Sequence, residues 1–191
     1  MLTTASVAFK EWASVVEALA TGEQILILRK GGIHEKGKKF NVEHESFFLF
    51  PTYEHQKEED LNPRGQALLS KVRSQPPLTD ATHVTFQYFA EAKESFWIDS
   101  FEKLLKLSAF HVWSENALRK RFTWGEEQGV FAIVVRIFQL PQSQALKNLP
   151  AYGGCRSWVE LKEPLNLSGL QPVLIETAFQ AKRNALHKSL S

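Results

Sequence analysis

The sequence is poor in cysteine, with a single thiol, Cys155, among its 191 residues. One thiol excludes an intrachain disulfide and any metal cluster built from several cysteines, and it fits a reducing compartment. The chain also has no apolar run as long as a membrane-spanning helix requires, and Lys10 and Glu11 interrupt its N-terminal apolar stretch. We therefore expect a cytoplasmic protein that has no membrane partner.

Several motifs that would identify an enzyme are also missing. Neither G-x-x-x-x-G-K-[ST] nor G-x-G-x-x-G occurs, so the common phosphate-binding and dinucleotide-binding loops are excluded. There is no G-x-S-x-G elbow of a serine hydrolase, and the six histidines do not form an H-E-x-x-H pair. We therefore predict no cofactor and no metal. The net charge of +2 neither requires nor excludes a nucleic-acid partner.

Aromatic residues, by contrast, are abundant: fourteen Phe and five Trp predict a core dominated by ring packing. One short proline-containing segment, residues 74–77, interrupts the pattern, and it is too short to link independent domains. Residues 1–191 should therefore form a single domain. We predict an α+β fold with a central mixed or mostly antiparallel sheet of about five strands, flanked by helices.

Hydrophobic periodicity places the expected elements along the chain. Three- and four-residue spacing of apolar side chains predicts helices at residues 4–20, 63–73, 101–107, 115–122 and 173–186. Alternating or continuous apolar runs predict strands at residues 24–28, 47–50, 83–98, 130–140 and 157–161, with a return strand beginning at 40–42. Glycines 31 and 32 should form a turn after the first strand.

Polar residues follow several of these runs, and strands often deliver such residues to a site at the edge of a sheet. Cationic side chains there can hold a phosphate or carboxylate, imidazoles can contact polar edges, and an indole can stack on a base. We predict a pocket for an anionic ligand or nucleic acid built from Arg29, Lys30, His44, Thr52, His55, His111, Trp113, Arg121 and Arg156.

Other interpretations stay open. Asp80, Glu91 and Lys93 resemble the residues with which a magnesium-dependent phosphodiesterase holds its metal and polarises water. A third interpretation is an adaptor protein without any small-molecule site. Each cationic cluster is also compatible with a solvated loop or helix face that has no function in binding.

Five strings together resemble a bacterial family of unknown function, numbered 1802, over about residues 9–186. They are KEWASVVEALATGEQILILRKGGI (10–33), FFLFPTYEHQ (47–56), HVWS (111–114), RF (121–122) and GGCRSWVEL (153–161). The resemblance implies a single-domain bacterial protein and no particular activity, and Glu91 and Lys93 lie outside these strings. The order of elements is also similar to small PUA and ASCH-type domains, which implies binding of RNA or modified nucleotides.

Overall fold

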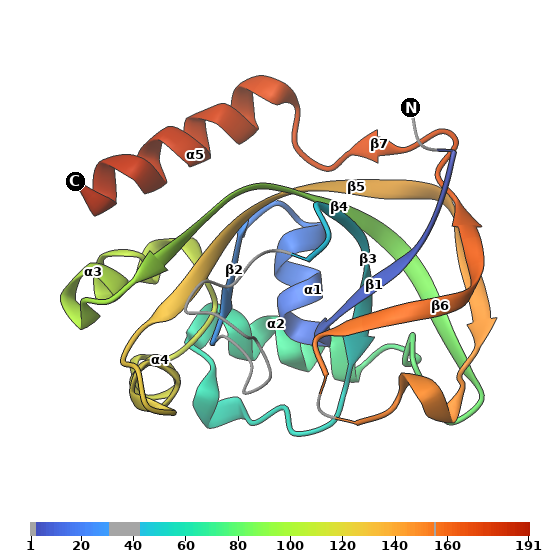
Figure 1. Ribbon diagram of the computed structural model, residues 1–191, viewed down its shortest axis with the longest axis horizontal. Helices are drawn as coiled ribbons and strands as arrows, with labels where there is room; N and C mark the ends of the chain where they lie inside the picture. The colour runs from blue at the N-terminus through green and yellow to red at the C-terminus, as the bar shows by residue number, and fades with distance from the viewer. Residues whose placement is uncertain (1–2, 31–42, 155) are drawn as a thin grey trace.

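The computed structural model describes residues 3–30, 43–154 and 156–191 (Figure 1). Three expectations fall outside these ranges: the glycine turn at residues 31 and 32, the return strand at 40–42, and the thiol at position 155.

The described strands form one seven-stranded mixed sheet, which confirms the α+β class and exceeds the five strands expected. Its order is β2-β5-β4-β3-β1-β6, with β7 paired to β5, and β1 and β3 are the parallel neighbours in this otherwise antiparallel sheet. The strands are β1 (Thr4–Trp12), β2 (Leu26–Arg29), β3 (Ser46–Thr52), β4 (His83–Ile98), β5 (Val130–Lys147), β6 (Trp158–Asn166) and β7 (Gln171–Pro172).

Five α-helices flank the described part of the sheet: α1 (Ala13–Ala20), α2 (Pro63–Arg73), α3 (Phe101–Lys106), α4 (Glu115–Thr123) and α5 (Glu176–Leu190). The serines expected to cap two of them do so, because Ser100 accepts from the Lys103 N–H and Ser114 from the Ala117 N–H. Helix α5 packs across β4 and β5 (Figure 1), with Phe179 and Leu186 buried.

The prediction of one helix over residues 4–20 is wrong for its first half. Thr4–Trp12 is strand β1, and the helix α1 begins only at Ala13. Phe9 and Trp12 do have helical spacing, but β1 finds a partner on each side, with Ala8 opposite both Phe48 of β3 and Val159 of β6. Two complete hydrogen-bonding partners outweigh a weak local helix preference.

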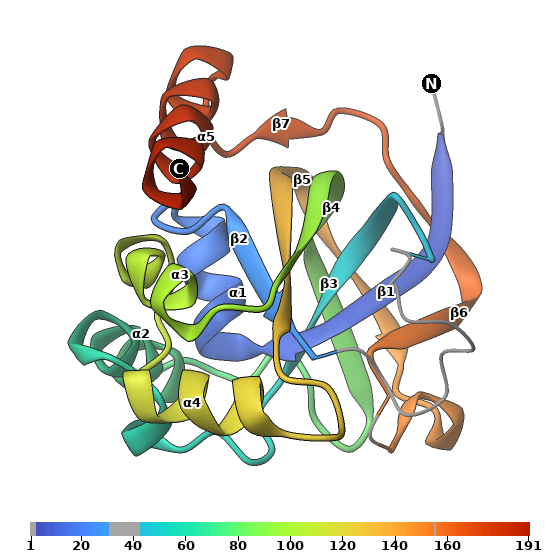
Figure 2. The same ribbon diagram turned by 60° about the vertical axis from the view of Figure 1, so that its left-hand side comes forward.

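Strand β3 shows how the core is organised. Phe47 and Leu49 face a larger apolar cluster on the α1 side of the sheet, whereas Phe48 and Phe50 face a smaller cluster on the other side. Alternate residues of a strand point to opposite faces, so a strand buried on both faces must be apolar throughout. The sheet also curves, and Figure 2 shows that its edge strand β2 comes to lie opposite the end of β1.

Candidate functional site

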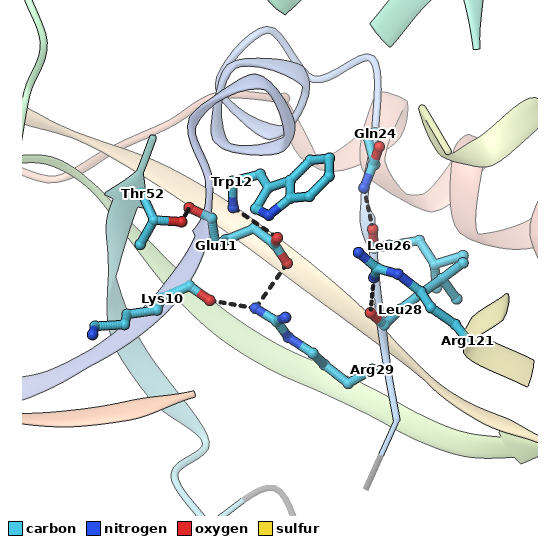
Figure 3. A network of polar contacts seen from close by, with 9 residues as sticks. All are labelled: Lys10, Glu11, Trp12, Gln24, Leu26, Leu28, Arg29, Thr52 and Arg121. Carbon is cyan, nitrogen blue, oxygen red and sulfur yellow. Dashed lines mark hydrogen bonds and ion pairs between the residues drawn. The ribbon is translucent and has the colours of Figure 1, made fainter. Parts of the chain in front are cut away.

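The C-terminal end of β1 is the point at which several of the predicted site residues meet. Lys10 and Glu11 are consecutive in the strand, so their side chains leave opposite faces (Figure 3). Glu11 points toward β2 and is only 2% exposed, whereas Lys10 lines a groove on the other side. Thr52, at the end of β3, joins this junction because its Oγ1 donates to the Glu11 carbonyl oxygen, 3.1 Å away.

The buried Glu11 carboxylate is neutralised by Arg29. Arg29 Nη2 lies 3.1 Å from Glu11 Oε2, and the same guanidinium donates to the Lys10 carbonyl oxygen. The backbone N–H of Trp12 donates to Glu11 Oε1 at 2.8 Å (Figure 3). A buried charge needs both a counterion and hydrogen bonds, and Glu11 has both.

Arg121 approaches the same pair from α4. Its guanidinium carbon lies 3.5 Å from the centre of the Trp113 ring, and its Nη1 donates to the Leu28 carbonyl oxygen at 3.3 Å. Burial, with a smaller contribution from the charge of Arg29, lowers the pKa of Arg121 to about 10, while Glu11 acts to raise it. Arg121 therefore stays cationic at neutral pH and adds a second positive charge beside one carboxylate.

His111 is close to this cluster but is enclosed by protein. Its Nδ1 accepts from the Trp113 N–H at 3.2 Å, which places the ring proton on Nε2. Burial lowers the pKa of His111 to about 4, and the charges of Arg64 and Arg121 act in the same direction. The ring is therefore neutral at physiological pH, and its buried Nε2–H has no hydrogen-bond partner among the described residues.

The structure places Lys30 apart from this group. Its Nζ donates to the carbonyl oxygens of Phe122 (3.2 Å), Glu127 and Gly129 (2.9 Å), so it closes the loop after α4. Burial lowers its pKa. With its three donors engaged by carbonyl oxygens, Lys30 has a clear structural role in this loop.

The remaining predicted residues lie around the edges of the site. The His44 ring packs edge-on against Trp158 at 5.1 Å, and Trp158 in turn packs on Phe9 of β1. His55 is exposed and has a positive φ of 61°. Arg156 is exposed and lies beside the end of β1, because the next residue, Ser157, accepts from the Lys10 N–H at 2.8 Å.

A groove of about 560 Å³ opens on the Lys10 side of β1. It runs between the ends of β1 and β3 and the turn that precedes β6, and it lies beside Arg156. Such a volume is within the range of small-molecule sites. Its walls include Phe50, Thr52, Tyr53, Asp80, Asn148 and Gly154.

The alternative interpretation, a magnesium site built from Asp80, Glu91 and Lys93, does not fit the structure. Asp80 is tied to the start of β4, since its Oδ1 accepts from the His83 N–H, and about 26 Å of strand separates His83 from Glu91. Two carboxylates that share a metal must lie within a few ångströms of each other. Glu91 instead pairs with Lys93 at 2.6 Å on the surface, and the described residues contain no cluster of metal-ligating side chains.

Sequence reasoning missed Glu11 and Lys10 as members of the site. The predicted helix over residues 4–20 includes both, and in a helix their side chains would be 100° apart, with Glu11 on a solvated face. The signal that could have identified Glu11 is its position directly before Trp12 and two residues after Phe9, because buried acids are rare unless they are paired.

The family that the sequence resembles is confirmed by a match over most of the chain. Residues 8–185 match the family described as "Domain of unknown function (DUF1802)". Among solved structures, the chain is similar to ASCH from Zymomonas mobilis, with 12% identity, 93% of each chain covered and a TM-score of 0.45. Two variant forms of that protein give TM-scores of 0.43 and 0.44. None of the curated proteins matches, and no described helix has the length and apolar character needed to cross a bilayer.

Proposed function

Because this chain belongs to the DUF1802 family, whose description assigns no activity, we propose from its own residues that it is a binding module for a phosphate-bearing ligand, with nucleic acid as the partner class. The proposed site is the end of β1, including the groove beside Lys10.

One observation carries this proposal: two arginines from different elements lie beside one buried carboxylate at the end of β1, and a third arginine is exposed next to the same strand end. Arg29 comes from β2, Arg121 from α4 and Arg156 from the turn before β6. Among the described residues, Glu11 is the carboxylate that lies within ion-pair distance of any of them. The local excess of positive charge favours an anionic partner.

The groove supplies the second requirement of a nucleotide site, which is a surface for a flat ring. Tyr53, which is partly exposed, contributes an aromatic wall, and Thr52 contributes a polar group beside it. Bases stack on aromatic faces while nearby cations hold the phosphates, and this combination is common where proteins bind unpaired strands.

The adaptor interpretation receives less support. An adaptor surface would need a contiguous apolar patch. In the described ranges the exposed large apolar side chains are Trp124, after α4, and Ile175, before α5.

The proposal is tested by the binding of a fluorescent single-stranded oligonucleotide over a series of salt concentrations. We expect affinity to fall with salt, and Arg156→Ala to weaken binding and reduce the slope by about 0.7. The matched control is Lys188→Ala on α5, which removes the same charge from an exposed position. Absence of binding at low salt, or an equal effect of the two variants, would refute the proposal.

A further inference from the structure

We propose that the ligand places an anionic oxygen against the inner face of β1, where Arg29 and the indole N–H of Trp158 donate to it. The inner face is the side of the strand that carries Phe9 and Glu11, opposite to the groove beside Lys10. This inference rests on the proposed function and deepens it, because it names the side chains that contact the phosphate group. It follows from hydrogen-bond donors that the fold buries without an acceptor.

Four buried side-chain nitrogens have no hydrogen-bond partner among the described residues. They are Arg29 Nε, His111 Nε2, Arg136 Nε and Trp158 Nε1. Each of these nitrogens carries a hydrogen, so all four are donors. A donor that is removed from water without gaining an acceptor destabilises the folded state, and such groups are therefore rare and need an explanation.

Two of the four donors lie against the same ring, that of Phe9. The guanidinium carbon of Arg29 is 4.6 Å from the centre of this ring, and the Trp158 ring packs on it at 4.7 Å. Phe9 and Trp158 are opposite each other in the ladder between β1 and β6, so their side chains share one face of the sheet. Two open donors thus come from different strands to one place, beside Glu11.

The other two donors have different surroundings. Arg136 lies against α5, with its guanidinium carbon 5.4 Å from the centre of the Phe179 ring, and it forms an ion pair with Glu176. His111 is only 1% exposed and has a neutral ring. Neither shares the Phe9 ring with a second open donor, so the inner face of β1 is the better place for a ligand.

The charges on the inner face favour an anion as the acceptor. Arg29 uses Nη2 for its described hydrogen bonds and leaves Nε and Nη1 for a ligand (Figure 3). Arg121 adds a second positive charge against the one buried carboxylate, that of Glu11. The carboxylates of Glu43 and Glu45, just before β3, are exposed, so water and salt screen them. A phosphate oxygen can accept from more than one donor at once.

A ligand has a route to both donors. The Arg29 side chain is 20% exposed, so solvent already reaches part of the guanidinium. The His44 ring packs edge-on against Trp158 at 5.1 Å, is half-buried and makes no described hydrogen bond. Without such a bond to hold it, this ring can change rotamer at little cost and make room beside the indole.

Oligonucleotide binding over a series of salt concentrations provides the first test. Trp158→Phe keeps an aromatic ring on Phe9 and removes the N–H donor. We expect it to weaken the binding of a single-stranded oligonucleotide about tenfold, the value of one hydrogen bond to a charged group. The salt slope should stay the same, because the variant removes no charge. The control is Trp97→Phe on β4, whose ring packs on Phe131, and it should leave the affinity unchanged.

The indole N–H signals in a nitrogen–proton NMR spectrum provide a direct second test. The chain has five tryptophans, and Trp158→Phe identifies the signal of Trp158 by its loss. Titration of the full wild-type chain with the same oligonucleotide should move this proton signal downfield, because a hydrogen bond to oxygen deshields the proton. Thermal unfolding of both variants establishes that they are folded.

The outcomes separate this inference from the function on which it rests. Unchanged affinity of Trp158→Phe, or a Trp158 signal that stays in place during binding, would overturn the inference and indicate that ordered water alone accepts from these donors. A weaker affinity with a reduced salt slope would also overturn it, because the variant would then act through a displaced arginine. In each case salt-dependent binding that Arg156→Ala weakens would leave the nucleic-acid function standing. Absence of oligonucleotide binding at low salt would remove both proposals.

Discussion

Glu11 and Arg29 join two strands that share no described backbone ladder, with Oε2 and Nη2 only 3.1 Å apart. Strand β2 pairs with β5 at one edge of the sheet, and β1 pairs with β3 and β6. Side chains rather than backbone groups therefore hold the curved sheet together at this point.

Removal of both partners of the Glu11–Arg29 pair should destabilise the protein by less than the sum of the two single removals. Glu11→Gln leaves two arginines beside a neutral group, and we expect it to lower the free energy of unfolding by about 3 kcal/mol. Arg29→Met should have a similar effect, and the double variant should be at least about 1 kcal/mol more stable than the sum of the two predicts. Urea unfolding measures all four proteins, and strict additivity would contradict the coupling.

His111 should make the protein less stable in mild acid. Its pKa is about 4 in the folded protein and near 6.5 in the unfolded chain, so the unfolded state binds the proton first. The contribution of His111 is complete above pH 6.5 and is lost as the pH falls toward 4, by about 3 kcal/mol.

The matched variant for this prediction is His111→Asn, whose side-chain oxygen can still accept from the Trp113 N–H. Urea unfolding between pH 7 and pH 4 should show a smaller loss of stability for His111→Asn than for the wild type. The two proteins should respond alike if the acid sensitivity arises from other groups.

Gly65 lies in the first turns of α2 but is not a neutral position. A Cβ there would lie 2.7 Å from the Val112 carbonyl oxygen and 3.0 Å from Leu61 Cβ. Replacing an exposed glycine inside a helix by alanine usually stabilises a protein by about 1 kcal/mol. Gly65→Ala should instead destabilise it, because the backbone around Val112 would have to move. Thermal unfolding tests this prediction through the change in Tm. A Tm above that of the wild type would contradict it and would show that α2 can shift to make room for the Cβ.

The surface pair of Glu91 and Lys93 should contribute little to stability or to oligonucleotide binding. Their side chains are 38% and 39% exposed, and exposed pairs contribute at most about 1 kcal/mol. Glu91→Gln should therefore leave stability and oligonucleotide binding almost unchanged. Addition of magnesium should give no nuclease activity in either protein, and magnesium-dependent cleavage that Glu91→Gln abolishes would restore the phosphodiesterase interpretation.

The fold was predictable from sequence wherever burial produced a clean pattern. Strand β4 was predicted with its observed bounds, and the caps at Ser100 and Ser114 are correct because capping depends on local chemistry. Strand β5 continues to Lys147, whereas the sequence predicts that it ends near residue 140. Its last residues are mostly polar and exposed, and they extend the strand by pairing with the start of β4. That pairing is a tertiary effect and leaves no periodic signal in the sequence.

Some of the residues that the sequence predicts to form a site lie close together, and others do not. Arg29, Thr52, Trp113 and Arg121 do gather near the end of β1. Lys30 is adjacent to Arg29 in sequence, but it lies just after the end of β2. Its side chain binds carbonyl oxygens of the loop after α4 and does not pair with Glu11. Alternation along an extended chain separates such neighbours, and only a known strand register would have revealed it.

The placement of β1 between β3 and β6 also has a consequence for biosynthesis. Strand β1 leaves the ribosome before both of its neighbours and can pair with β3 early, but its second neighbour lies some 150 residues further along, with Ala8 opposite Val159. Until that late segment emerges, one side of the nascent β1 stays open, and the Lys10 N–H still awaits the Ser157 carbonyl oxygen. Completion of this end of β1 is thus deferred until residues 157–159 have been translated.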